Sequence, residues 1–297
     1  MRSGSKAETG YDDIDVHCPA DGRLVARVPD NSSETVTETV RRLRAHQVEW
    51  EALGPKGRAK WLRKLRDWLL DNERHLIDVL QSETGKPRAE AAIEPALACD
   101  LINYFADNAG TFLADERVKP HGPLSMTKRL IKTVRPYPVV GVITPWNFPM
   151  SMPAWMVLPA LAAGNTVVFK PSEETPLCGQ AYADVLNEVL PEDVLIVVHG
   201  ADDQGKAIVQ SEVDMIAFTG SREVGKHILR ESSGTLKRVV LELGGKDPMI
   251  VLEDADIGRA AKFAARNSFG NAGQVCVSVQ RVFAHRSIAR DLAERLA

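Results

Sequence analysis

Hydrophobic and polar positions follow a helical pattern through the first third of the chain. Apolar residues recur about every three or four positions, which is typical of amphipathic helices that bury one face. The pattern predicts a series of helices: one capped by Ser32 or Ser33, one through the Trp61 region to Leu70, one over residues 75–84 and one over residues 88–109. Breaks are expected at residues 54–57 and 85–87, and Pro95 should kink or restart the last helix. Ahead of these helices, residues 14–29 predict an extended stretch with a turn at 19–22.

The pattern changes at residue 137. Residues 138–144 form a short, nearly continuous apolar run, which is typical of a strand buried on both faces of a parallel sheet. After it, expected helices over residues 158–163, 177–190 and 205–210 alternate with expected strands over 166–169, 194–198 and 215–218. Such a series of β-α-β units predicts an α/β fold with an open, doubly wound parallel sheet. Before this series, residues 124–135 alternate weakly, as a hairpin or edge ribbon does.

Composition narrows the class of protein. The chain has 297 residues, 44% of them hydrophobic and 26% charged, which predicts a globular protein of two domains. A formal net charge of -3 gives no support to nucleic acid as a partner. One basic run is interleaved with apolar residues at helical spacing, which predicts a solvated helix face: Arg58, Lys60, Arg63, Lys64 and Arg66.

The sequence also bears on where in the cell the protein is located. No apolar run approaches the ~18 residues that a membrane span needs, so no membrane partner is expected. No targeting segment is visible, and residues 1–13 predict a flexible tail. The four cysteines have no paired spacing, which argues against a disulfide framework or a metal site and favours the reducing cytoplasm: Cys18, Cys99, Cys178 and Cys276.

In doubly wound sheets, ligands bind beyond the carboxyl ends of the strands, so the turns after the strands are candidate sites. Asn147, in the turn Pro145-Trp146-Asn147-Phe148-Pro149, could donate to a developing oxyanion or simply complete the bend. In the turn over residues 170–176, Lys170 and Glu173 could bind ribose hydroxyls or form a solvated turn with a helix cap.

A third turn follows the strand at residues 215–218. Gly220 and Ser221 open a helix whose free N–H groups could receive a pyrophosphate, and Gly225 would let that helix approach closely. The spacing is neither the dinucleotide G-x-G-x-x-G pattern nor a P-loop, so it indicates phosphate binding only weakly.

Two further residues are candidates for chemistry. Cys276 follows the glycine-bearing turn at residues 269–275, after a helix that Asp254 or Asp256 can cap, and is either a thiolate nucleophile or a small buried side chain. Glu242 is a lone glutamate in the apolar run 239–245. Burial there would raise its pKa toward that of a general base, or else it faces water at the end of a strand.

Five strings of the sequence, taken together, resemble the aldehyde dehydrogenase superfamily. They are Pro145-Trp146-Asn147-Phe148-Pro149, Phe169-Lys170-Pro171-Ser172-Glu173, Phe218-Thr219-Gly220-Ser221, Leu241-Glu242-Leu243-Gly244-Gly245-Lys246 and Gly273-Gln274-Val275-Cys276. The similarity runs from about residue 14 to the end of the chain. It implies a Rossmann-like cofactor domain and an enzyme that oxidises a small aldehyde to a carboxylic acid with NAD or NADP, through a cysteine thiohemiacetal and a thioester.

The resemblance also implies roles for single residues. The catalytic set is Cys276 as nucleophile, Asn147 as oxyanion donor, Glu242 as general base, and Lys170, which with Glu173 binds the adenosine ribose. The implied cofactor-binding residues are Ile143, Thr144, Pro145, Trp146, Lys170, Ser172, Glu173, Gly220, Ser221, Gly225, Leu243 and Gly244, and no metal is implied. Glu173 favours NAD over NADP, because a carboxylate at the 2′-hydroxyl repels a 2′-phosphate.

The end of the chain departs from the family pattern, because family members continue far beyond the nucleophile. The resemblance therefore implies a cofactor domain at 14–243, with an oligomerisation ribbon at 124–137, and an incomplete catalytic domain at 244–297. Full-length relatives form homodimers or homotetramers. The 297 residues alone are expected to be marginally stable or sticky and to have little activity.

Two other functions stay open. One is a truncated, non-catalytic cofactor-binding fragment of such an enzyme. The other is a CoA-acylating relative, which Glu242 disfavours, because transfer of the thioester to a thiol needs no base for hydrolysis. Semialdehydes such as succinate semialdehyde are plausible substrates by resemblance.

Overall fold

The computed structural model describes residues 13–297, except for the side chains of Ala183, Leu186 and Asn187. Of the tail expected at residues 1–13, only residue 13 is among the described residues. The chain divides into two compact units. The larger runs up to Phe218 and includes Ile228–Val240; the smaller comprises Thr219–His227 and Leu241–Ala297.

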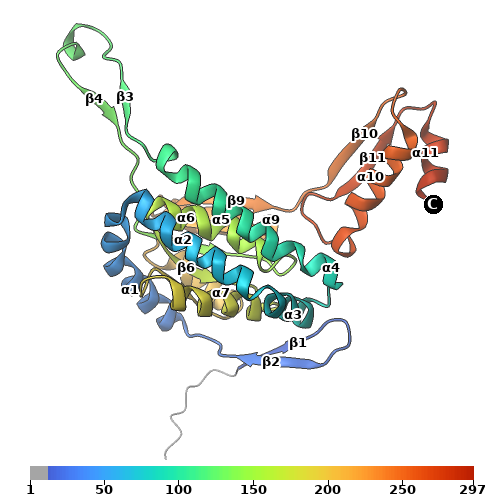
Figure 1. Cartoon of the computed structure of the whole chain (residues 1–297), viewed down its shortest axis with the longest axis horizontal. Helices are drawn as coiled ribbons and strands as arrows, with labels where there is room; N and C mark the ends of the chain where they lie inside the picture. Colours follow the sequence, from blue (N-terminus) through green and yellow to red (C-terminus); the bar gives the residue numbers. More distant parts are fainter. Residues whose placement is uncertain (1–12) are drawn as a thin grey trace, which may run out of the picture. The chain divides into compact units, whose positions relative to one another are not determined.

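A five-stranded sheet with the strand order β7-β6-β5-β8-β9 carries the fold. Figure 1 labels two of its strands, β6 and β9, among the helices around them. Its strands are β5 (Val139–Ile143), β6 (Thr166–Lys170), β7 (Leu195–Val197), β8 (Met215–Gly220) and β9 (Arg238–Leu243). β5 pairs in parallel with both β6 and β8, and β6 pairs in parallel with β7. From β5 the chain adds β6 and β7 on one side, and then adds β8 and β9 on the other side of β5. This order confirms the predicted doubly wound α/β sheet, and every residue of β5 and β6 is buried, as their apolar sequences predicted.

Helices cover the sheet. α6 (Ser151–Ala163) packs on β5 and β6, and α7 (Pro176–Val189) packs on β7. Outside them lie α2 (Gly54–Asp71), α3 (Glu73–Thr84) and α5 (Ile93–Phe112). α1 (Ser33–Ala52) and α8 (Asp202–Gln210) pack on each other and on β5 and β6. Because parallel crossovers are right-handed, α8 and α6 lie on opposite faces of the sheet.

Several boundaries differ from the predicted ones for local reasons. The first break falls at Leu53 and not within residues 54–57, because Pro55 is tolerated in the first turn of α2, where its missing N–H costs no hydrogen bond. A short helix, α4 (Arg88–Ala91), is followed by a restart at Ile93, which places Pro95 in the first turn of α5. Helix α6 begins at Ser151, earlier than the expected residue 158.

Two hairpins lie outside the main sheet. β1 (Ile14–His17) and β2 (Leu24–Val28) pair antiparallel, which confirms the expected extended stretch and turn. β3 (Glu116–Val118) pairs antiparallel with β4 (Leu130–Lys132), and a short 3₁₀ turn, η1 (Pro123–Ser125), lies between them. The ribbon thus begins before the predicted residues 124–135, and residues 124–129 form its tip rather than a strand.

Arg58 overturns part of the predicted solvated face of α2. Lys60 and Lys64 are exposed, but Arg58 is buried and donates hydrogen bonds to the backbone oxygens of Glu51 and Ala162. These carbonyls lie in the last turns of α1 and α6, where helix carbonyls lack the N–H donor four residues on. The guanidinium is therefore drawn inward by helix ends that the sequence pattern does not reveal.

The smaller unit has a separate, modest core. β10 (Asp247–Val251) and β11 (Val279–Ala284) form a parallel pair, against which α10 (Ile257–Phe269) and α11 (Ala289–Leu296) pack. The buried core is Val251, Ala260, Ala261, Ile288 and Leu292. The side chain of Asp256 caps α10 as predicted, whereas β10 was not expected.

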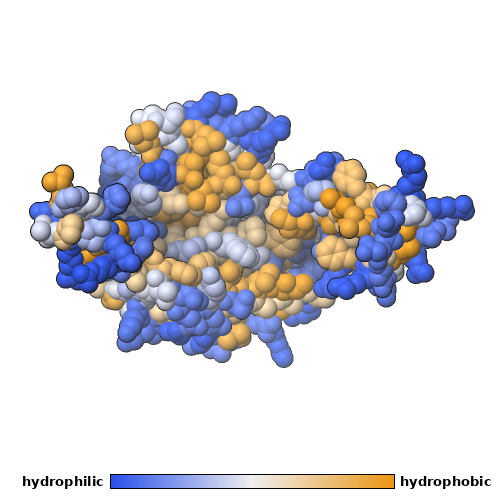
Figure 2. Space-filling view, turned by 90° about the horizontal axis from the view of Figure 1, so that it is seen from above, coloured by the Kyte–Doolittle hydropathy of each residue, from blue (hydrophilic) through white to orange (hydrophobic). Residues whose placement is uncertain are grey.

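Apolar side chains also reach the surface, and Figure 2 shows hydrophobic atoms in orange on the face that it draws. In the smaller unit, Ile250 and Phe283 are paired in the β10–β11 register and are 71% and 53% exposed. Within residues 13–297, no helix is both long and apolar enough to cross a membrane.

Candidate active site

The carboxyl ends of β5 and β6 bring several predicted residues together. Ile143 lies opposite Lys170 of β6 and Phe218 of β8 in the sheet register. The backbone N–H of Thr144 donates to the Lys170 oxygen at 3.2 Å, which extends the pairing one step beyond the strand. Both Ile143 and Thr144 are buried, whereas Trp146 is 42% exposed. The chain order of the sheet reverses at β5, so these residues lie at the switch point where such sheets bind ligands.

Lys170 is fixed by three acceptors. Its Nζ donates to the oxygen of Gly200 at 2.5 Å, to that of Pro171 at 3.0 Å and to Glu173 Oε2 at 3.3 Å. Burial lowers the pKa of Lys170, and the charge of Glu173 opposes that shift. The Glu173 side chain remains 42% exposed. The two residues that the sequence singled out are therefore held together, with the carboxylate open to water.

Ser172 has a local structural contact. Ser172 is buried, and its hydroxyl accepts a hydrogen bond from the Glu174 N–H at 3.3 Å. This contact shapes the turn that leads into α7.

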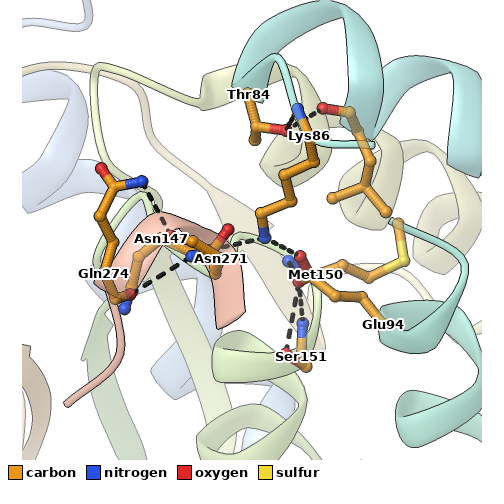
Figure 3. Close-up of polar contacts among 9 residues, drawn as sticks. Thr84, Lys86, Glu94, Asn147, Met150, Ser151, Asn271 and Gln274 are labelled. Carbon is orange, nitrogen blue, oxygen red and sulfur yellow. Dashed lines mark hydrogen bonds and ion pairs between the residues drawn. The ribbon is translucent and has the colours of Figure 1, made fainter. Parts of the chain in front are cut away.

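Asn147 stands in the turn between β5 and α6, which is held from a distant part of the chain (Figure 3). The Asn147 backbone oxygen accepts a hydrogen bond from Lys86 Nζ at 2.6 Å, and Lys86 forms an ion pair with Glu94 at 2.5 Å. Glu94 Oε2 accepts from the N–H groups of Met150 and Ser151 at 3.0 Å each. The sequence interpretation missed Lys86 and Glu94, although a glutamate directly before Pro95 at an expected helix start was an available signal.

Gly220 ends β8, and Ser221 directly precedes α9 (Arg222–Ser233). The Ser221 hydroxyl accepts a hydrogen bond from the Val224 N–H at 3.2 Å, so it caps the helix. A Cβ at Gly225 would lie 2.9 Å from a methyl carbon of Leu243, so the helix does approach β9 closely there.

The turn before Cys276 is unusual in its backbone. After α10, the 3₁₀ turn η2 (Gly270–Gly273) carries Asn271, Ala272 and Gly273 at φ values of 51°, 54° and 77°. Left-handed backbone is costly for Ala272, so the surroundings must hold it. The side-chain nitrogens of Asn271 and Gln274 donate to each other's backbone oxygens at 3.3 and 3.1 Å (Figure 3).

The helix before this turn is only partly buried. Ala260, Ala261 and Ala264 of α10 are buried, whereas Phe269 at its end is 74% exposed. Cys276 itself is partly buried. A Cβ at Gly245 would lie 3.0 Å from the Cys276 backbone oxygen, so the segment after β9 passes directly beside the cysteine.

The exposure of Glu242 decides between two alternatives that the sequence left open. It was expected to be either buried or exposed at a strand end, and it is exposed. β9 is the edge strand of the sheet and alternates exposed with half-buried residues, and Glu242 falls on an exposed position. Gly244 is also exposed. The argument that burial prepares Glu242 as a base is therefore wrong for this chain.

The larger unit holds Asn147, Lys170 and Glu173, and the smaller unit holds Ser221, Glu242 and Cys276. Among the described residues, no three histidine, cysteine, aspartate or glutamate side chains gather as metal ligands would.

A doubly wound sheet with polar side chains at its switch point is the architecture of nucleotide-binding enzymes. The chain belongs to the aldehyde dehydrogenase family, whose sequence model matches residues 6–297.

Individual relatives agree with this assignment. The chain is 39% identical to a mitochondrial succinate-semialdehyde dehydrogenase of Oryza sativa subsp. japonica, covering 98% of this chain and 55% of the relative. It is 38% identical to a probable succinate-semialdehyde dehydrogenase [NADP(+)] of Sinorhizobium fredii, covering 93% and 56%. The crystal structure of an NAD-dependent aldehyde dehydrogenase from Sinorhizobium meliloti matches with a TM-score of 0.92 at 35% identity, covering 99% and 59%. The chain thus spans little more than half the length of these relatives.

Proposed function

We propose that this chain carries the cofactor-binding domain, at 14–243, and the nucleophile-bearing start of the catalytic domain, at 244–297, of an NAD(P)-dependent aldehyde dehydrogenase. The observation that carries the proposal is the Lys170–Glu173 pair at the carboxyl end of β6, beside Ile143 and Thr144 at the switch point. An amine and an exposed carboxylate held at this edge suit the two hydroxyls of a ribose.

The residues fit a dinucleotide at other points. Gly220 and Ser221 precede an α9 whose first N–H groups suit a pyrophosphate, and Gly225 keeps that helix close to β9. Pro145, Trp146, Ser172, Leu243 and Gly244 complete the cofactor-lining set that we propose. The bound dinucleotide supplies the hydride acceptor.

The chain's own residues supply the rest of the chemistry. Cys276, as thiolate, attacks the aldehyde carbon, and the resulting oxyanion is stabilised by the Asn147 amide and the Cys276 N–H. Loss of hydride leaves a thioester on Cys276. Glu242 removes a proton from the water that hydrolyses this thioester, which releases the carboxylic acid and restores the thiolate.

For the cofactor we propose NAD, because the carboxylate of Glu173 repels a 2′-phosphate. The relatives do not decide the matter, since the Sinorhizobium fredii protein is described with NADP and the Sinorhizobium meliloti protein as NAD-dependent.

We further propose a semialdehyde as substrate, because succinate-semialdehyde dehydrogenases stand among the relatives. A homodimer or homotetramer is proposed for the full-length form, with the β3–β4 ribbon at its interface, and the cytoplasm as its location. Leu124 and Met126 at the ribbon tip are 95% and 73% exposed, which suits burial against a second subunit.

A second candidate function is a non-catalytic cofactor-binding fragment. The exposure of Glu242 favours it, since a base for hydrolysis works best in a site that excludes bulk water. Both candidates include dinucleotide binding and differ only in turnover.

A single-turnover experiment tests the proposal. The purified chain is mixed with a small panel of aldehydes and either NAD or NADP, and NADH or NADPH formation is followed, with Cys276→Ala as control. Little activity is expected of these 297 residues alone, so a burst that requires Cys276 and is larger with NAD would show that they already assemble a working hydride-transfer site. Cofactor binding without any burst would favour the non-catalytic fragment, and no binding of either cofactor would contradict both candidates.

A further inference from the structure

A buried ion pair lies beneath the Asn147 turn, formed by Lys86 and Glu94 (Figure 3). Their side chains are 5% and 1% exposed. Lys86 reaches in from the loop between α3 and α4, and its Nζ stands 4.4 Å from the centre of the Phe148 ring. One cation therefore contacts two successive residues of the turn, the Asn147 oxygen through a hydrogen bond and Phe148 through its ring.

Glu94 secures the other end of the same turn. Helix α6 receives no side-chain cap from its own N-cap residue, Met150. Glu94 caps it instead, accepting from the N–H groups of Met150 and Ser151 and from the Ser151 hydroxyl. A carboxylate is favourable at this end of a helix, because the unpaired N–H groups carry partial positive charge.

Capping alone does not require a lysine, as a neighbouring helix demonstrates. At the start of α7, the buried Glu83 accepts from the N–H groups of Leu177 and Cys178 at 2.8 Å each, and no ion pair accompanies it among the described residues. A buried ion pair also adds little net stability, because desolvation of both charges offsets their attraction. The feature that distinguishes Lys86 is its bond to the Asn147 backbone.

We propose that Lys86 and Glu94 are positioning residues that fix the backbone of Asn147 and thereby aim its side-chain amide. Lys86 holds the carbonyl of Asn147, and Glu94 holds both Lys86 and the first turn of α6. The turn is therefore clamped on either side of Phe148. The proposal rests on the oxyanion role proposed for Asn147. It gives a positioning role to Lys86 and Glu94, which act through Asn147 and not on the substrate.

The test uses the double variant K86M/E94Q, which removes both charges and nearly preserves side-chain size. The amide oxygen introduced by E94Q can still accept from Met150 and Ser151, so the helix cap survives while the bond to the Asn147 oxygen is lost. Glu83→Gln is the matched control, because it alters an equivalent cap on α7. Each protein is labelled with ¹⁵N-asparagine, and the Asn147 side-chain signals are assigned from their absence in Asn147→Ala.

The wild-type chain should give one well-dispersed pair of Asn147 amide signals. In K86M/E94Q that pair should broaden or move to the region of freely rotating amides, while melting stays within about 3 °C of wild type. Glu83→Gln should leave the pair unchanged. An unchanged pair in a folded K86M/E94Q would overturn the proposal. If the double variant does not fold, Glu94→Asp replaces it. This variant keeps both charges but shortens the carboxylate, and the Asn147 signals should again broaden or move.

Kinetics separate this proposal from the proposed function. Where the wild-type chain gives a burst, K86M/E94Q should slow it by about 10²-fold, the usual cost of losing one oxyanion donor, with half-saturation by aldehyde within about threefold. Displaced Asn147 signals without a slower burst would support positioning and refute the oxyanion role of Asn147. If the chain gives no burst, turnover by these 297 residues alone is refuted, while the amide signals still decide the positioning proposal.

Discussion

The buried carboxylates of Glu83 and Glu94 both lie at helix N-termini, where backbone N–H groups replace the lost water. Glu94 also has a cation beside it, whereas Glu83 has none within the part of the chain that the structure describes. Burial raises the pKa of Glu83 to about 7, although the hydrogen bonds from Leu177 and Cys178 act in the opposite direction. Near neutral pH the Glu83 carboxyl is therefore only partly ionised.

The raised pKa of Glu83 predicts a pH-dependent stability. The ordinary glutamate pKa is 4.5, so between about pH 4.5 and 7 the folded state binds more protons than the unfolded state. The free energy of unfolding must then fall as pH rises through this window, by about 3 kcal/mol at most from this residue. Glu83→Gln should lose this contribution, so its melting temperature should fall less than that of wild type between about pH 5 and pH 8.

Glu174→Gln is the matched control, because Glu174 is exposed in the neighbouring turn and should leave the wild-type profile unchanged. His199 titrates in the opposite direction, since burial lowers its pKa to about 4 and its contribution is lost as pH falls from 6.5. The comparison is therefore made between variants and not on the wild-type curve alone. Parallel curves for wild type and Glu83→Gln would show that Glu83 ionises normally.

Single residues also mark the limit of sequence interpretation at this scale. A lone glutamate among apolar residues left burial and exposure both open at Glu242, and that residue is exposed, while Glu83 and Glu94 are buried. The difference depends on which strand forms the edge of the sheet and which helix start lies nearby. Both are tertiary facts. The pairing of Lys170 with Glu173, three positions apart in one turn, was local and could be expected.

At the scale of elements, Arg58 joins two helix ends. Its guanidinium donates to the oxygens of Glu51 and Trp50 at the end of α1, and to those of Ala162 and Ala163 at the end of α6. The last carbonyls of a helix lack intrahelical partners and carry partial negative charge, so one buried cation satisfies both ends.

Arg58→Met should therefore destabilise the larger unit by about 3 kcal/mol or more, because it leaves several buried carbonyls without donors. Arg58→Lys should recover little, since one ammonium cannot reach carbonyls of both helices as the planar fork does. The shift in urea midpoint, at constant slope, measures the change. Lys60→Met, two residues away and exposed, should stay within about 0.5 kcal/mol, and an equal loss in both would refute the clamp.

The hydrophobic pattern of the sequence predicted most of the helices and strands, but it did not predict where each of them begins and ends. The central strands were recognisable because both of their faces are buried, which makes their sequences continuously apolar. β3 and β10 went unrecognised: Glu116–Val118 is short and wholly exposed, and Asp247–Val251 contains Pro248, which is unusual in a strand. Glu116–Val118 thus lacks an apolar run, and in Asp247–Val251 the proline argued against a strand despite the apolar residues after it.

At the scale of the whole molecule, the two compact units have separate cores of unequal size. The core of the larger unit includes Leu65, Leu158 and Phe169 and draws on the sheet and the helices around it. The smaller core holds few buried side chains: Val251, Ala260, Ala261, Ile288 and Leu292. Its parallel strand pair leaves Ile250 and Phe283 exposed, although parallel sheets are normally covered on both faces.

We therefore expect the smaller unit to unfold at a lower denaturant concentration than the larger one. All five tryptophans lie in the larger unit, so their fluorescence reports on that unit alone: Trp50, Trp61, Trp68, Trp146 and Trp155. Hydrogen exchange of α10 and α11, followed by mass spectrometry, reports on the smaller unit. Exchange there should reach its midpoint before the fluorescence changes.

Two core variants make this expectation specific. Leu292→Ala removes a buried side chain of the smaller core and should lower the stability of α10 and α11 by about 2–4 kcal/mol, leaving the fluorescence transition in place. Leu65→Ala, in the larger core, should move the fluorescence transition by a similar amount. If Leu292→Ala shifts both signals together, the units unfold as one, and the exposed apolar pair Ile250 and Phe283 would not make the smaller unit the weaker one.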